Sequence, residues 1–291
     1  MFRARIADVA ALLGAMVLFA GTAMAATITV DDDGPADYSS IREAVEAASE
    51  GDTVFVKPGT YTVTREPEYG GGIEMKEALV LQGAGADSTF IKPDLSARPW
   101  ELIYFNGASA EIDGFTMSYP DGEAIFINMG TWQTGRMGGP TWVPSPNWAP
   151  PTITNNKIVN SRGAIVIYYN PGIRLGTING NTITGNRTGI FIAVPRVVQS
   201  QRGTPYALDL SWNWWGTAVE YEIEATLTFN VPSDAFIITW RPWLTEPIST
   251  FAEAPGVHYN NIYANQTNIE MGILWLEVEG LSWGVVKSRF R

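Results

Sequence analysis

The chain has 291 residues, of which 30 are acidic and 19 basic, and its formal net charge of −11 at pH 7 argues against nucleic acid as a partner of the whole molecule. It contains no cysteine and one histidine, which excludes disulfide bonds and cysteine-linked lipids and disfavours a transition-metal site.

Residues 1–25 have the order of segments that is typical of a secretory signal peptide. Arg3 and Arg5 precede an apolar run that starts at Val9, and residues 23–25 (Ala-Met-Ala) form a small-residue cleavage site. A membrane anchor is the alternative, but the run is short for a bilayer span and no later stretch is long and apolar enough for one. We expect a secreted, periplasmic or cell-surface protein whose mature chain has no membrane span.

A short helix is expected near the start of the mature chain. Residues 41–48 carry apolar side chains at helical spacing, with Ser39 or Ser40 placed to cap the helix and Gly51 to end it. Residues 53–56 are then expected to form the first strand of a β-structure. A helix at this position would cover the open edge of that structure.

The middle of the chain repeats itself. Residues 153–167 align without a gap on residues 178–192 at an offset of 25; Asn156 falls on Asn181, and the same frame returns 32 residues later at Asn213. A period of this length, with alternating β-branched residues separated by Asn and Gly, predicts an all-β parallel β-helix. In this solenoid three short strands per coil stack about 4.8 Å apart, and the recurring Asn faces inward and bonds to its equivalent in the next coil.

Three segments interrupt the repeat at equivalent points. Residues 128–151 are rich in Gly, Pro and Trp and are expected to form a long loop without strands, and residues 168–177 and 193–206 leave the following coils at the same place. The three loops should therefore wall a groove along one side. Their aromatic side chains are candidates for stacking on sugar rings, although they could instead fold each loop onto its coil. These candidates are Trp132, Trp142, Trp148, Tyr168 and Tyr169.

The same region is basic. No acidic residue occurs between Ala124 and Leu208, whereas seven basic residues do. Arg162 and Arg187 occupy equivalent positions of adjacent coils, and like charges that close disfavour each other unless an anion lies between them. The hypothesis is a basic groove that binds an acidic polysaccharide; the alternative is a set of arginines that point into solvent. The other arginines expected on its rim are Arg136, Arg174, Arg196 and Arg202.

Several segments resemble one group of proteins. These are DYSSIREAVEAASEGDTVFVKPGTY (residues 37–61), LVLQGAGADSTFI (79–91), NWWGT (213–217), EYEIEATL (220–227) and IITWRPWL (237–244). They resemble the N-terminal cap, the next coil and the closing segment of secreted parallel β-helix proteins of the pectate-lyase-like superfamily. The resemblance implies a right-handed coil with a short N-terminal capping helix, and its motifs are specific to architecture rather than to activity. The R-x-P-x-x-R segment of the lyases and the Gly-His-Gly of the hydrolases do not occur in this chain.

The chain is expected to contain one domain and a C-terminal extension. After the signal peptide, the β-helix domain would cover residues 26–244, a linker residues 245–256, and a repeat-like or capping segment residues 257–291.

No cofactor is required by these motifs, and calcium is a weak alternative. Three consecutive aspartates at residues 31–33 lack the spacing of a calcium-binding loop. Asp113, Asp121 and Glu123 lie close in sequence and could hold calcium or act as a glycosidase pair, although such groups are more often solvated turn residues.

The sequence therefore predicts an exported protein that binds extracellular acidic polysaccharide without strong catalysis. A lyase acting on a uronate-containing glycan, with an arginine as the base and no assigned catalytic residue, is the first alternative. A glycoside hydrolase is a weaker enzymatic alternative, and a structural or adhesive surface protein is the third. The oligomeric state stays open.

Overall fold

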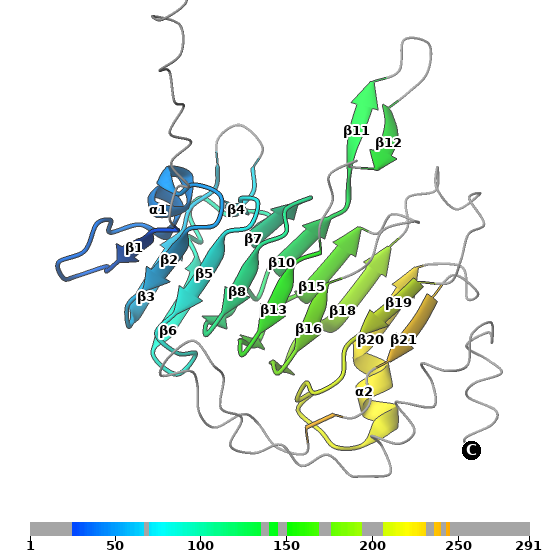
Figure 1. The fold of residues 1–291 in the computed structure, drawn as a ribbon. Coiled ribbons are helices and arrows are strands. Elements are labelled where there is room, and N and C mark those ends of the chain that lie inside the picture. Colours follow the sequence, from blue (N-terminus) through cyan, green and yellow to red (C-terminus); the bar gives the residue numbers. More distant parts are fainter. Residues whose placement is uncertain are drawn as a thin grey trace, which may run out of the picture.

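The computed structural model describes residues 25–66, 70–134, 140–144, 150–168, 176–193, 206–230, 236–239 and 243–244. This part of the chain is mostly β-structure, with 21 strands and two short helices. Three sheets of parallel strands run side by side along the molecule (Figure 1). The arrangement fits the predicted parallel β-helix.

Each of the three sheets has its own row of strands. Sheet A contains β1 (Thr27–Val30), β2 (Thr53–Val56), β5 (Val80–Gly83), β8 (Glu111–Asp113), β13 (Thr152–Thr154) and β16 (Thr177–Asn179). Sheet B contains β3 (Gly59–Val63), β6 (Thr89–Pro93), β9 (Thr116–Met117), β14 (Lys157–Val159) and β17 (Thr182–Thr184). Sheet C contains β4 (Ile73–Met75), β7 (Glu101–Asn106), β10 (Glu123–Asn128), β15 (Gly163–Tyr168), β18 (Thr188–Ala193) and β20 (Leu227–Asn230).

The chain visits the three sheets in the same order in each coil. From β2 to β18 every coil adds one strand to sheet A, then one to sheet B, then one to sheet C, apart from the inserted β11 and β12. The repeat offset of 25 residues matches the strand pairing between two neighbouring coils in all three sheets. Ile153 pairs with Ile178, Ile158 with Ile183 and Ile165 with Ile190. This part of the sequence prediction is confirmed.

The interior is made of columns of apolar side chains. In each sheet, in-register residues of successive coils point inward and are buried, such as Ile112, Ile153 and Ile178 in sheet A. Removing an isoleucine side chain from water contributes about 1.5–3 kcal/mol. A chain without disulfides is thus stabilised along its length by these columns.

The recurring asparagine forms the predicted ladder at the turn between sheets A and B. The side-chain oxygen of Asn181 accepts the backbone N–H of Asn156 at 3.0 Å, and that of Asn213 accepts the N–H of Asn181 at 2.9 Å. The residue before each ladder position has a positive φ, +55° at Asn155 and +67° at Gly180. Asn and Gly recur at this turn because they tolerate the left-handed region of backbone space.

The N-terminal helix lies where the apolar spacing placed it. Helix α1 (Ile41–Ala47) is capped by Ser40, whose side chain accepts the N–H of Glu43. Its buried residues Ile41, Ala44 and Val45 join the core beside β1, β2 and β4. The second helix, α2 (Glu220–Thr226), lies beside β18 and β20.

The expectation of a strand-free loop over residues 128–151 is wrong. Strands β11 (Gly130–Thr134) and β12 (Pro140–Pro144) form an antiparallel hairpin in which Trp132 and Trp142 are register partners, and the hairpin projects away from the sheets (Figure 1). The Gly and Pro content hid two short runs of Thr, Trp and Val, residues that favour strands. Two further strands, β19 (Tyr206–Asp209) and β21 (Phe236–Thr239), pair in parallel.

Within the described ranges, neither helix is long and apolar enough to cross a membrane. Residues 1–24 of the predicted signal peptide and all of residues 245–291 lie outside these ranges.

Candidate functional site

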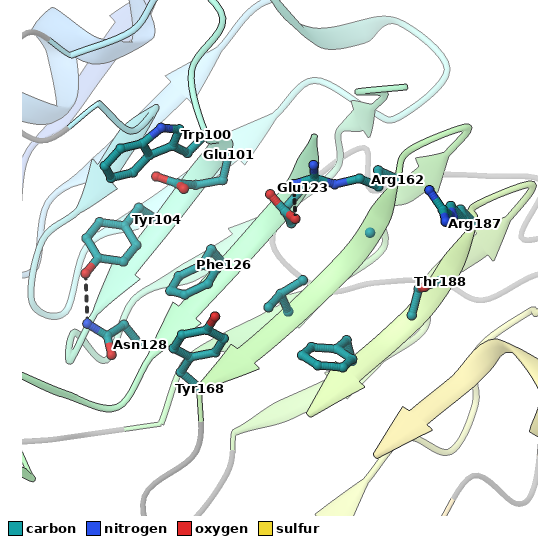
Figure 2. A pocket seen from close by; sticks show the side chains of 13 residues that line it. Trp100, Glu101, Tyr104, Glu123, Phe126, Asn128, Arg162, Tyr168, Arg187 and Thr188 are labelled. Atoms are coloured by element: carbon teal, nitrogen blue, oxygen red, sulfur yellow. Dashed lines mark hydrogen bonds and ion pairs between the residues drawn. The ribbon is translucent and has the colours of Figure 1, made fainter. Parts of the chain in front are cut away.

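A groove with a volume of about 630 Å³ lies on the outer face of sheet C. Its floor is formed by strands β7, β10, β15 and β18, and thus by four successive coils. Figure 2 shows two rows of side chains in it: Glu101, Glu123, Arg162 and Arg187 in one row, and Tyr104, Phe126 and Tyr168 beside them.

The strand sequences explain why these side chains share one face. In β7 and β10 two consecutive residues are buried, Leu102 with Ile103 and Ala124 with Ile125. The residues on either side of each buried pair, a glutamate before it and an aromatic residue after it, line the groove. Since the strands are in register, each type of side chain forms a line along the stack.

Aromatic rings form the apolar part of the floor. The ring centres of Tyr104 and Phe126 are 5.8 Å apart, and those of Phe126 and Tyr168 are 4.8 Å apart with an edge-on geometry. Val166 occupies the equivalent position on β15, and Phe191 follows it on β18. At the other end Trp100 is 58% exposed, with the guanidinium of Arg65 5.5 Å from its ring centre. Exposed rings in a row are typical platforms for sugar rings.

Glu101 is the buried carboxyl group of the groove, with 6% of its surface exposed. Burial raises the pKa of Glu101 to about 7, and the charges of Glu123 and Glu74 act in the same direction. The N–H of Gly72 donates to its side chain at 3.4 Å, and this hydrogen bond acts in the opposite direction. Gly72 is required there, because a Cβ on it would lie 2.3 Å from the carbonyl oxygen of Glu101.

Glu123 forms an ion pair with Arg162 of the next coil. The two side chains are only partly covered, so the pair contributes little to stability. Its effect on the groove is electrostatic: the positive charge of Arg162 is neutralised by a carboxylate from another coil.

Arg162 and Arg187 lie in adjacent coils, as the repeat predicts. The N–H of Thr188 donates to the carbonyl oxygen of Arg162 at 3.0 Å, and both arginines line the groove. They are not equivalent, however, because Arg162 pairs with Glu123 whereas Arg187 has no acidic partner in the described part of the chain. The groove therefore presents one uncompensated arginine.

The basic middle of the chain is neutralised in the same way at Lys157. This residue forms an ion pair with Asp87, which lies 70 positions earlier in the sequence. Stacked coils bring acidic residues from outside residues 124–208 against the basic ones. The predicted patch of positive charge is correspondingly reduced to Arg187 among the described basic residues of that stretch.

The three segments that interrupt the repeat follow strands of sheet C that end in register. Asn128, Tyr168 and Ala193 end β10, β15 and β18 and are register partners. Asn128 and Tyr168 line the groove, and the amide of Asn128 donates to the hydroxyl of Tyr104 at 2.9 Å.

The other predicted site residues lie either in the hairpin or outside the described residues. Trp132 and Trp142 lie in the hairpin, of which only the backbone is described. The remaining predicted residues lie outside the described residues: Arg136, Arg174, Arg196, Arg202, Trp148 and Tyr169.

Sequence reasoning missed the groove residues of β7 and, apart from Glu123, those of β10. The signal was present, since ELIYFN (Glu101–Asn106) and EAIFIN (Glu123–Asn128) repeat a glutamate, an isoleucine, an aromatic residue and an asparagine at an offset of 22. Of the carboxylates that were considered, Asp113 lies on β8 in sheet A, bonded to Thr154 and Asn155, away from Glu123. The second glutamate of the groove is Glu101, the register partner of Glu123 on β7.

The oxygens of Asp31, Asp32 and Asp33 lie within 4.8 Å of one another, as a cation site would require. Two of the three already serve the protein: Asp31 pairs with Lys57 at 3.1 Å, and Asp32 accepts the N–H of Thr60 at 3.0 Å. This cluster is an internal tie between β1, β2 and β3.

Comparison with known proteins returns no match to a family model, to a curated protein or to a solved structure.

Proposed function

We propose that this chain is an exported, right-handed parallel β-helix protein that binds extracellular acidic polysaccharide in the groove on sheet C. The repeating order of sheets A, B and C supports the solenoid, and parallel crossovers are right-handed in about 98% of cases. The resemblance to the pectate-lyase-like superfamily supports the same hand and assigns α1 the role of N-terminal cap.

The observation that carries the proposal is a row of aromatic rings in a groove that also contains Arg187, which has no acidic partner among the described residues. Tyr104 and Phe126 offer ring faces on neighbouring coils, and Phe191 offers a third beyond Val166 of the coil between, so that sugar rings of an extended chain can stack on them. Arg187 then offers a guanidinium for a uronate carboxylate, with which it can form two parallel hydrogen bonds.

The charge distribution restricts where an acidic sugar binds. Glu123 and Arg162 neutralise each other, and Glu101 is largely protonated below pH 7 because burial raises its pKa to about 7. The acidic subsite is therefore at the β18 end, and the β7 end favours an uncharged face of the chain. The proposed ligand is a polysaccharide in which some sugars carry a carboxylate group and others present an uncharged face.

Affinity electrophoresis through gels that contain polygalacturonate, alginate or a neutral glucan tests this function. The wild type is expected to be retarded by an acidic polymer, and Arg187→Ala to weaken that binding about 10-fold, the loss of one charged hydrogen-bonded contact. Lys92→Ala is the matched control, because it removes one positive charge from sheet B, away from the groove.

Equal retardation in all gels, or equal effects of the two variants, would contradict the proposal. Retardation in no gel, together with self-association of the chain, would favour a structural or adhesive role.

A further inference from the structure

Glu101 and Glu123 place two carboxyl groups in the groove, one coil apart. They are register partners on β7 and β10, so their Cα atoms are about one strand spacing apart, ~4.8 Å. Both line the groove beside the aromatic rings, where a bound sugar would lie.

The two carboxyl groups have different surroundings. Glu101 is buried, and the charges of Glu123 on β10 and Glu74 on β4 act on it, so burial and like charge favour its protonated form. Glu123 is partly exposed and forms an ion pair with the guanidinium of Arg162, which lies in the turn before β15. A buried carboxyl group and an ion-paired one, on neighbouring coils of the same groove, can divide the roles of acid and nucleophile between them.

We propose that the groove hydrolyses glycosidic bonds of the polysaccharide that it binds, with Glu101 as the acid and Glu123 as the nucleophile, an inference that rests on the proposed function.

The reaction needs only water as a second substrate. The proton of Glu101 passes to the glycosidic oxygen as its bond to the anomeric carbon breaks, and the carboxylate of Glu123 forms a bond to that carbon. Water then gives a proton to Glu101, and its oxygen displaces Glu123 from the sugar. Both glutamates return to their starting forms, and one glycosidic bond and one water become two hydroxyl groups.

The position of Arg187 distinguishes this reaction from elimination. β18 is two strands from β10, so the guanidinium belongs to a coil about 10 Å along the stack from Glu123. A uronate bound there is a neighbour of the sugar that is cleaved. A lyase would need its cation beside the carboxylate of the reacting sugar itself, and Arg162, the arginine that contacts Glu123, is already paired with that glutamate.

The test incubates the full chain with polygalacturonate, alginate and neutral glucan and measures both new reducing ends and the ultraviolet absorbance of unsaturated uronate. Reducing ends without that absorbance are expected from a polymer that retards the chain in gels. Glu101→Gln and Glu123→Gln should each lower the rate at least 100-fold while retardation is kept, which shows that the groove is still folded. Glu111→Gln is the matched control, a half-buried glutamate of sheet A, and should keep the wild-type rate.

Retardation without any reducing ends would overturn hydrolysis and leave the binding function intact. Reducing ends accompanied by unsaturated uronate, or rates that both variants keep, would also overturn it. Retardation by none of the polymers would remove the proposed function and this inference together.

Discussion

Glu101 and Glu123 are register partners, 22 residues apart in sequence and one strand apart in space. Glu101 is buried and its pKa is raised to about 7, whereas Glu123 is partly exposed and is paired with Arg162. The same side chain thus has two different surroundings at equivalent positions of the repeat, and the ionisation of Glu101 can be tested directly.

The contribution of Glu101 to the free energy of unfolding should fall as the pH rises from about 4.5 to about 7. The pKa of Glu101 is raised in the folded state from 4.5 to about 7, so the folded chain binds more protons than the unfolded chain in this window. The contribution is fully present below pH 4.5 and lost above pH 7, and it amounts to about 3 kcal/mol.

Urea unfolding of Glu101→Gln at pH 4 to 8 checks this expectation. The variant should match the wild type at low pH and exceed its stability at pH 8, whereas Asn128→Ala, an uncharged change in the same groove, should keep the wild-type slope. A parallel pH dependence of the wild type and Glu101→Gln would show that Glu101 is not the group responsible.

Arg162→Ala should raise the pKa of Glu101 above its value of about 7. The substitution leaves the charge of Glu123 unopposed, and that charge already disfavours ionisation of Glu101. Carbon-13 NMR titration of glutamate carboxyl groups measures the midpoint. Lys92→Ala on sheet B serves as the control, and an unchanged midpoint in Arg162→Ala would mean that the ion pair has no influence on Glu101.

Phe126→Ala should weaken polysaccharide binding about 5-fold, because a stacked ring contributes about 1 kcal/mol. Its ring contacts Tyr168 and lies beside Tyr104, in the middle of the aromatic line. The loss should persist at high salt, whereas the loss caused by Arg187→Ala should shrink as salt screens the charge. Gel retardation at two salt concentrations separates the two, with Phe90→Ala on sheet B as a control ring. Loss of binding in both phenylalanine variants would place the effect on the fold instead of the groove.

Asn181→Ala should destabilise the chain by about 3 kcal/mol, the cost of leaving buried polar groups unpaired. Its side chain accepts the N–H of Asn156 and donates to the carbonyl oxygen of Ile153 at 2.8 Å. Asn179→Ala, two residues earlier on β16, is the matched control, since it removes an amide outside the ladder. Equal unfolding midpoints in urea for the two variants would refute a structural role of the ladder.

The repeat made the architecture predictable from sequence. An offset of 25 residues fixes which isoleucines and asparagines stack, because a parallel stack in register places equivalent residues one above the other. The helix at residues 41–47 followed from its apolar spacing and its serine cap. The hairpin of β11 and β12 did not follow, because its Gly and Pro residues masked two short strands.

The charge of the site was harder to predict, for a physical reason. Counting charges along the chain compares residues that are near in sequence, whereas the coils bring together residues such as Arg162 and Glu123, 39 positions apart. Glu101 escaped notice because its raised pKa depends on burial in the folded chain, which no local sequence pattern shows.

The ends of β10, β15 and β18 at Asn128, Tyr168 and Ala193 lie in register, so the segments that follow them can be changed separately from the coils. Segments of any length can begin there without shifting the hydrogen-bonded register of the coils beneath. Exchanging one such segment for another should therefore retune which polymers the surface accepts while the scaffold keeps its melting temperature.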